Sequence, residues 1–175
     1  MRMELERYLF QRDNMKTLLI FLSILTLDVN SDIKLLAEAL VKDYQFKEIV
    51  YENNKAIQES VGTIVRAENK LIVSISSPFR ETYKVDAKNI EHIDHDLDQT
   101  QLIPINAINS SLLNVFLKVD YEELKKLNID MIDNMFTLNE QNQKLEFFLQ
   151  NNALKKINYF DNLDYRHEVI LALHD

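Results

Sequence analysis

The stretch INAINSSLLNVFLKVDYEELKKL, residues 105–127, decides the fold, because its apolar residues recur at helical spacing. Leu112, Leu113 and Phe116 fall on one side of the predicted helix. Ser110 is a candidate N-cap, since a serine oxygen can accept a bond from a free N–H of the first turn. The flanking segments have the two-residue period of β-strands, so the sequence predicts a helix inserted into a sheet.

Short strands are predicted on both sides of this helix, with turn residues every 8–12 positions, as in an antiparallel meander. In one of them Leu71, Val73 and Ile75 share a face, and Pro78 ends the strand. A first helix is predicted over 32–44, from Leu36 and Leu40 among charged residues. The predicted strands cover 46–52, 56–68, 70–79, 81–89 and 89–97, and then 129–140, 143–152, 154–162 and 165–173. The expected class is mainly β (α+β), with a curved antiparallel sheet and two covering helices.

Length and charge limit the function. The chain has 175 residues, which favours one domain, expected over 32–175. It carries 20 Lys and Arg against 28 Asp and Glu, a net charge of −8. Contacts with phosphate need a basic face, so we expect no nucleic-acid partner and no attraction to anionic lipid headgroups.

Glycine and cysteine are the scarce residues. Gly62 is the only glycine, so turns that need a positive φ must use Asn or Asp. Asn stands at the expected breaks, which are 52–54, 87–89, 139–142 and 150–152. Cysteine is absent, which excludes disulfides, thiolate metal sites and a Cys nucleophile.

An apolar run near the N-terminus has the pattern of a secretory signal. MKTLLIFLSILTLDVNS, residues 15–31, has a basic start, ten apolar-rich residues at 18–27 and a polar end. The run is shorter than the roughly 20 residues that span a bilayer. A buried N-terminal helix is the alternative. We expect a signal peptide over 15–31, with residues 1–14 as an extension from an upstream start codon and Met15 as the true start.

The polar residues offer little chemistry. His92 and His95 lie in an acidic segment, but three residues apart on a strand they point to opposite faces, so no metal site is expected. The serines among the strands have no glycine elbow, and His167 and His174 have no recognisable catalytic partner. We therefore expect no cofactor and no enzymatic activity.

The apolar residues leave two interpretations. They can fill an ordinary core, which is the more common outcome, or they can line an incompletely filled cavity between a curved sheet and its helices. Composition and spacing do not separate these alternatives.

Four stretches, in order, resemble the periplasmic outer-membrane lipoprotein carrier family, LolA. FKEIVYENNKAIQESVGTIV resembles the family's first hairpin, and SPFRETYKVDAKNIEHIDHDLDQT its central proline-to-glutamine run. NSSLLNVFL resembles its Leu-rich inserted helix, and FTLNEQNQKLEFFLQNNALKKINYFDNLDYRHEVIL its closing strands. The match covers nearly all of 32–173. It implies an incomplete, curved barrel with helices in its opening.

The resemblance also implies a function in the periplasm of a Gram-negative cell. The cavity of such a carrier shelters the acyl chains of lipoproteins released by an inner-membrane ABC-type complex, and the carrier passes them as a monomer to an outer-membrane acceptor, LolB. The acceptor itself and an envelope-sensing lipid-binding domain are alternatives with the same fold. The acceptor is lipidated on a Cys, which this sequence lacks.

The resemblance assigns the cavity and its lid. The family's Arg-Pro after the second strand is replaced by AENK at 67–70, which makes the adjacent Arg66 the candidate lid latch. Aliphatic residues replace the family's strand aromatics, so the cavity is expected to differ in shape. The expected cavity lining is Leu36, Leu40, Leu71, Val73, Ile75, Ile93, Leu112, Leu113, Phe116, Phe136, Phe147 and Leu149.

Overall fold

The two outermost strands of a single open sheet are joined by the inserted helical segment. A computed structural model describes residues 32–67, 70–108, 110–117, 119–140 and 143–174. The chain divides into two units, 1–34 and 35–175, and the second contains the whole sheet. The signal peptide and start site predicted within 1–31 lie outside the described residues.

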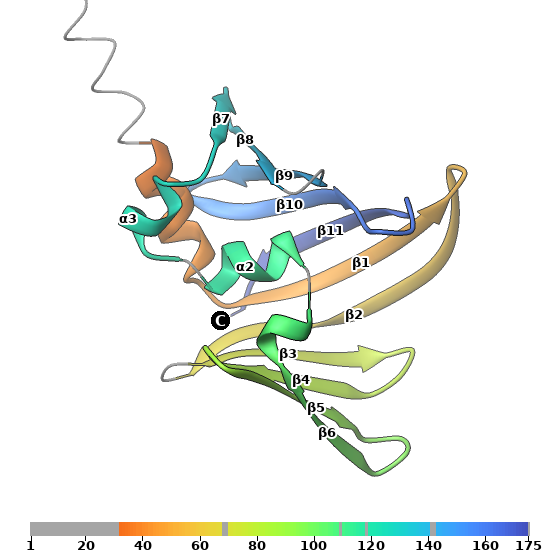
Figure 1. The fold of residues 1–175 in the computed structure, drawn as a ribbon. Helices are drawn as coiled ribbons and strands as arrows, with labels where there is room; N and C mark the ends of the chain where they lie inside the picture. The colour runs from red at the N-terminus through yellow and green to blue at the C-terminus, as the bar shows by residue number, and fades with distance from the viewer. Residues whose placement is uncertain (1–31, 68–69, 109, 118, 141–142, 175) are drawn as a thin grey trace, which may run out of the picture. The chain divides into compact units, whose positions relative to one another are not determined.

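Eleven antiparallel strands form the sheet, in the order β6-β5-β4-β3-β2-β1-β11-β10-β9-β8-β7 (Figure 1). The first six are β1 (Tyr44–Glu52), β2 (Lys55–Ala67), β3 (Lys70–Ser77), β4 (Glu81–Val85), β5 (Asn89–Asp94) and β6 (Gln99–Pro104). The others are β7 (Ile129–Ile132), β8 (Met135–Glu140), β9 (Gln143–Gln150), β10 (Ala153–Phe160) and β11 (Arg166–Leu173). The sheet is curved and its edges, β6 and β7, do not pair, so the predicted α+β half-barrel is confirmed.

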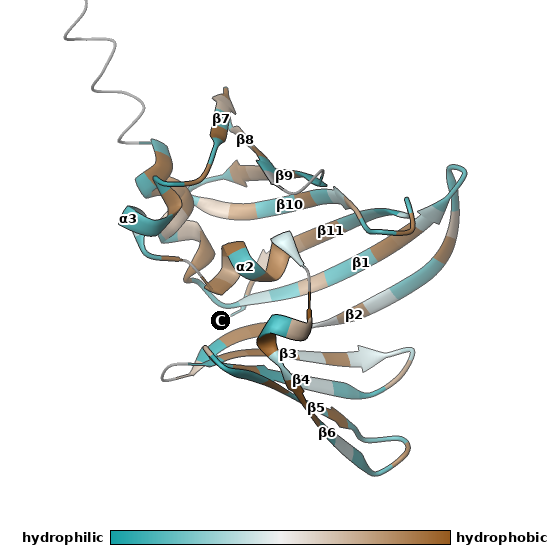
Figure 2. Ribbon diagram, in the orientation of Figure 1, coloured by the Kyte–Doolittle hydropathy of each residue, from teal (hydrophilic) through white to brown (hydrophobic). Residues whose placement is uncertain are grey.

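The connection between the two edges contains η1 (Ile105–Ala107), α2 (Ser111–Leu117) and α3 (Tyr121–Leu124). Because β6 and β7 lie at opposite edges, this connection has to cross the sheet, and it does so over the concave face (Figure 1). In Figure 2 α2 is largely hydrophobic, whereas the turn between β1 and β2 is hydrophilic. The topology therefore places an apolar helix over the inner face of the half-barrel.

The inserted helix is shorter than predicted and is broken into pieces. Ser110 caps α2 as expected, because its Oγ accepts a bond from the backbone N–H of Leu113 at 3.2 Å. A second helix starts after Asp120, whose carboxylate accepts a hydrogen bond from the backbone N–H of Glu122 at 2.7 Å. Side chains of this kind favour helix starts over helix interiors, so Asp120 begins α3 instead of continuing α2.

The first helix also ends early, at residue 40 and not at 44. Tyr44 belongs to β1, and its hydroxyl donates to the carbonyl of Ala39 at 2.7 Å. The same oxygen accepts the N–H of Leu154 at 3.0 Å. Tyr44 is fully buried and thus ties the end of this helix to β10.

Two strand predictions need correction at the sheet edges. β6 was not predicted, because residues 99–101 are all polar and show no apolar alternation; the structure leaves them exposed. The strand predicted over 129–140 is a hairpin of β7 and β8, divided at Asp133, where φ is 55°. The prediction that Asn and Asp supply the positive φ values is confirmed at Asn53, Asn54, Asp98, Asp133, Asn151, Asn152 and Asp164.

The core is uneven across the sheet. The largest fully buried side chains come mainly from β8 to β11 and from the helices, and include Phe136, Phe147 and Leu124. In the wing formed by β4, β5 and β6, the buried apolar residues are Val85 and Ile90. The helices therefore cover one half of the concave face more completely than the other.

Candidate functional site

A cavity of about 210 Å³ lies between α2 and the concave face of the sheet. Leu112, Leu113 and Phe116 of α2 form one wall. The opposite wall consists of apolar side chains from β1, β2, β3, β10 and β11, which are Phe46, Ile64, Leu71, Val73, Ile75, Ile157 and Val169. Ser110, Glu48, Tyr83 and Tyr159 complete the lining. A mostly apolar cavity with few polar groups is the usual form of a small-molecule site.

The structure brings six of the predicted lining residues together here: Leu71, Val73, Ile75, Leu112, Leu113 and Phe116. Leu36, Leu40, Phe136 and Phe147 are almost completely buried but do not line this cavity, so they are core residues. Leu149 pairs with Leu154 on β10 and is also outside the cavity wall.

Ile93 is placed on the wrong face by the prediction. It pairs with Thr82 and Thr100, whereas its neighbour His92 pairs with Tyr83, which lines the cavity. Side chains alternate between faces along a strand, so Ile93 points to the convex side.

Eight lining residues were not predicted. Phe46, Ile64, Ile157 and Val169 are apolar; in the sheet Ile64 pairs with Val73, and Ile157 pairs with Val169. Glu48 lies on the same face of β1 as Tyr44, Phe46 and Val50. A single carboxylate on an otherwise apolar and aromatic strand face could have identified Glu48 from the sequence. Tyr83, Ser110 and Tyr159 are the others.

Arg66 joins β2 to the ends of two helices. Its Nε donates to the carbonyl of Leu40 at 3.3 Å, and its Nη2 donates to the carbonyl of Phe116. Its backbone N–H donates to Asp43 Oδ1 at 2.8 Å. The last carbonyls of a helix have no partner within the helix, and a cation there also interacts favourably with the helix dipole. Arg66 therefore holds the C-terminal ends of both covering helices against the sheet.

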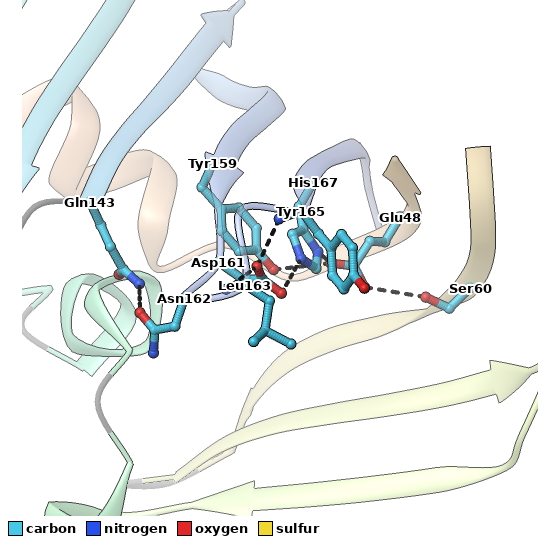
Figure 3. Close-up of polar contacts among 9 residues, drawn as sticks. All are labelled: Glu48, Ser60, Gln143, Tyr159, Asp161, Asn162, Leu163, Tyr165 and His167. Atoms are coloured by element: carbon cyan, nitrogen blue, oxygen red, sulfur yellow. Dashed lines mark hydrogen bonds and ion pairs between the residues drawn. The ribbon is translucent and has the colours of Figure 1, made fainter. Parts of the chain in front are cut away.

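A polar cluster borders the cavity at Glu48 (Figure 3). The Glu48 carboxylate accepts hydrogen bonds from Tyr159 at 3.0 Å and Ser60 at 3.3 Å. His167 lies 2.9 Å from the same carboxylate through Nδ1 and 3.4 Å from Asp161 through Nε2. The His167 ring stacks on Tyr159, with ring centroids 4.4 Å apart.

The electrostatics of this cluster favour an ion pair. Burial alone would lower the pKa of His167, but hydrogen bonds and charges from Glu48 and Asp161 raise it overall. Burial alone would raise the pKa of Glu48, but the bond and charge of His167, with Tyr159 and Ser60, lower it overall. Burial and the Glu48 charge raise the pKa of Tyr159, so its hydroxyl stays a donor.

A second Tyr–His stack lies in the other wing of the sheet. Tyr83 and His92 stack with centroids 4.5 Å apart. The Tyr83 hydroxyl donates to Glu81 at 2.6 Å, and His92 Nε2 lies 3.8 Å from the same carboxylate. Burial, together with Glu81, raises the pKa of Tyr83. Asp94 pairs with Glu81 in the ladder, so both acids project from the concave face beside Tyr83.

Neither cluster has the donor set of a metal site. Within the described residues, no group of three or more His, Cys, Asp or Glu side chains is arranged to hold an ion. Glu48 is instead hydrogen-bonded to the Tyr159 hydroxyl and to His167, and Glu81 to the Tyr83 hydroxyl.

A larger hollow of about 530 Å³ lies on the other face of the sheet. It is bordered by Gln45, Lys47, Thr63 and Ile170, whose side chains are partly or fully exposed. No residue of α2 contributes to its described walls, so it lacks the cover of the inner cavity. The inner cavity is therefore the better candidate for an apolar ligand.

In the described part of the chain no helix is long and apolar enough to cross a membrane.

Comparison with known proteins supports the fold, but no ligand, partner or activity. An uncharacterised conserved protein from Thermus thermophilus superposes with a TM-score of 0.50 and 7% identity, over 85% of this chain and 88% of that one. Lower scores are found for a LolA superfamily protein from Nitrosomonas europaea, with a TM-score of 0.44 and 10% identity over 81% and 93% of the two chains. LprF from Mycobacterium bovis superposes with a TM-score of 0.38 and 8% identity, over 83% of this chain and 91% of that one.

No family model matches the sequence, and no curated protein matches it either. The architecture is nevertheless a LolA-like fold, an open antiparallel half-barrel whose concave face is crossed by helices. The fold implied by the sequence resemblance is confirmed, and at these identities the likeness extends to the fold alone.

Proposed function

We propose that the protein binds the acyl chains of lipoproteins in the cavity beneath α2 and carries them across the periplasm. The observation that carries this proposal is the apolar cavity itself, with walls from six strands and a separate helix. Each methylene group moved from water into such a site contributes about 0.8 kcal/mol. The proposal assigns the protein no catalysis.

The cavity has to enlarge to admit a long chain. At about 210 Å³ it is smaller than most small-molecule sites, which measure about 300–1,000 Å³. α2 is the part that can move, because it belongs to the connection between the sheet edges and not to the sheet. Displacing α2 exposes the inner faces of β1 to β3 without breaking a ladder.

Arg66 supplies a reversible closure. Its side chain bonds to two main-chain carbonyls, so opening breaks bonds that water can replace. A hydrogen bond of this kind contributes about 0.5–1.5 kcal/mol net, or about 1.5–3 when one partner is charged. Such energies suit a carrier that must release its ligand.

The finer parts of the proposal come from the resemblance. We expect a periplasmic monomer that receives acylated lipoproteins from an inner-membrane ABC-type release complex and delivers them to a LolB-like acceptor. The LolA-like fold supports this assignment.

The test is binding of an uncharged fluorescent acyl probe, followed by co-purification with an acylated lipoprotein. Phe116→Glu puts a charge into the apolar wall and should weaken both by at least about tenfold, since burying a charge is costly. Leu102→Glu is the matched control, because Leu102 is 68% exposed on β6.

Circular dichroism shows whether each variant folds. Equal binding by wild type and folded Phe116→Glu would contradict the proposal, as would absence of probe binding by the wild type.

A further inference from the structure

The polar groups of the cavity lie toward one end of it. Arg66 and Leu71 face each other at the end of the sheet where α2 is held. Glu48 lies further along β1, toward the β1–β2 turn, and Glu81 lies at the start of β4, whereas Val85 at its end pairs with Leu71. A chain that lies along the cavity therefore has an apolar end near Leu71 and a polar end near Glu48 and Glu81.

The polar end carries negative charge that is not balanced within the cavity wall. Apart from the tyrosines, Glu48 is the only ionisable residue among the described residues that line the cavity. No Lys, Arg or His lines the wall in this part of the chain. Glu81 and Asp94 stand beside Tyr83 on the same face, where one imidazole, that of His92, lies 3.8 Å from Glu81 and can balance at most one of the two acids.

His167 can balance at most one of the two carboxylates that it contacts, and it offers a ligand no free ring nitrogen. Its two ring nitrogens already contact Glu48 and Asp161. The Glu48 carboxylate, in turn, is held by donors from the protein: Tyr159, Ser60 and His167. An anionic headgroup would meet these carboxylates, and no Lys, Arg or His among the described lining residues faces it, at a site where burial strengthens repulsion.

From this asymmetry we propose that the cavity selects acyl ligands whose polar end carries no negative charge. Ester- and amide-linked chains meet this requirement, and so does an amine, whereas a free fatty acid or a phospholipid does not. The inference rests on the proposed acyl-binding function and deepens it, because it separates lipoprotein acyl groups from the common anionic lipids.

The experiment measures displacement of the uncharged fluorescent probe by three ligands with the same saturated chain. They end in a glycerol ester, an amine and a carboxylate, and are used below micelle-forming concentrations at about pH 8, where a free carboxyl is ionised. The ester and the amine should bind at least about tenfold more tightly than the carboxylate.

Glu48→Gln keeps the side-chain shape and removes the charge, so it should bring the carboxylate within about threefold of the ester. Glu168→Gln is the matched control, because Glu168 pairs with Ile49 and Asn158 on the convex face. It should leave the wild-type ranking unchanged. If Glu48→Gln does not fold, the order in which the wild type binds the ester, the amine and the carboxylate tests the inference by itself.

Two failures are distinguishable. A carboxylate that binds the wild type as tightly as the ester overturns this inference and leaves acyl binding intact. Lack of displacement by all three ligands overturns the proposed function, and this inference with it.

Discussion

The guanidinium of Arg66 donates a hydrogen bond to the main-chain carbonyl of Phe116, and so fastens the end of α2 to the inner face of β2. Phe116 also lines the cavity, which means that the residue held by Arg66 is the residue that covers the site. The same guanidinium reaches Leu40 at the end of the first helix. The Arg66 side chain therefore fixes the ends of both helices that cover the sheet.

Arg66→Lys should loosen the lid. Lysine provides a point charge in place of the planar fork, so it cannot bond both carbonyls in the same geometry. We expect the free energy of unfolding to fall by about 1–2 kcal/mol and the amide hydrogens of α2 to exchange faster. Arg166→Lys is the control, because Arg166 lies over the Tyr51 ring and pairs with Glu168 at 3.6 Å, away from the cavity. Unchanged exchange in α2 would show that Arg66 does not restrain it.

The Glu48–His167 pair should make stability depend on pH. The pKa of His167 is raised above its ordinary 6.5, so its stabilisation is complete below about that value and is lost as the pH rises through the folded pKa. The pKa of Glu48 is lowered below 4.5, so its stabilisation is present above that value and is lost as the pH falls through the folded pKa. The pair should contribute most between these limits.

Urea unfolding of wild type and His167→Gln across this range measures the effect. The difference in the free energy of unfolding should reach about 1–3 kcal/mol near pH 5.5 and shrink above about pH 8. His174→Gln is the control, since that ring contacts the amide of Gln45 at 3.4 Å and not a carboxylate. A difference that stays constant with pH would mean that His167 is not charged in this window.

Much of the fold follows from local sequence rules, and the exceptions have physical causes. Alternation identified most of the strands, and Asn pairs marked the tight turns, because both signals depend on a few neighbouring residues. The edge strand β6 was missed, since an exposed edge needs no apolar face. The break between α2 and α3 depends on the Asp120 cap, which competes with a helical period that continues through it.

The candidate site was only partly predictable for a different reason. Leu71, Val73 and Ile75 were found because one strand shows its own alternation. Ile93 was misplaced because a short polar strand does not reveal which face is concave. Glu48 on β1 is far in sequence from Tyr159 and His167, which lie on the consecutive strands β10 and β11, so their contact depends on the pairing of β1 with β11.

Gly62 should be intolerant of any side chain. A Cβ added there would lie 2.1 Å from the carbonyl oxygen of Ser74 and 2.8 Å from the Phe46 ring. The first contact is with backbone, so Gly62→Ala must shift β3, and the second requires the Phe46 ring to move as well. We expect a loss of about 1–3 kcal/mol in the free energy of unfolding and weaker acyl-probe binding. The neighbouring Thr63→Ala, on the other face, should have a small effect on both. A fully stable Gly62→Ala protein would contradict the close packing of these strands.

The turn between β9 and β10 offers a test of how Asn replaces glycine in this chain. Asn151 and Asn152 have φ values of 53° and 56°, and they alone connect the paired residues Gln150 and Ala153. A left-handed residue with a side chain costs roughly 1–2 kcal/mol, and Asn reduces that cost by local hydrogen bonding. Asn152→Ala should therefore lower the free energy of unfolding by about 1 kcal/mol, whereas Asn152→Gly should leave it unchanged or raise it. At the exposed strand residue Thr100 the order should reverse, because glycine in extended backbone costs about 0.5–1 kcal/mol relative to alanine. If alanine is as stable as glycine at position 152 in urea unfolding, this hairpin does not use the left-handed conformation at that residue.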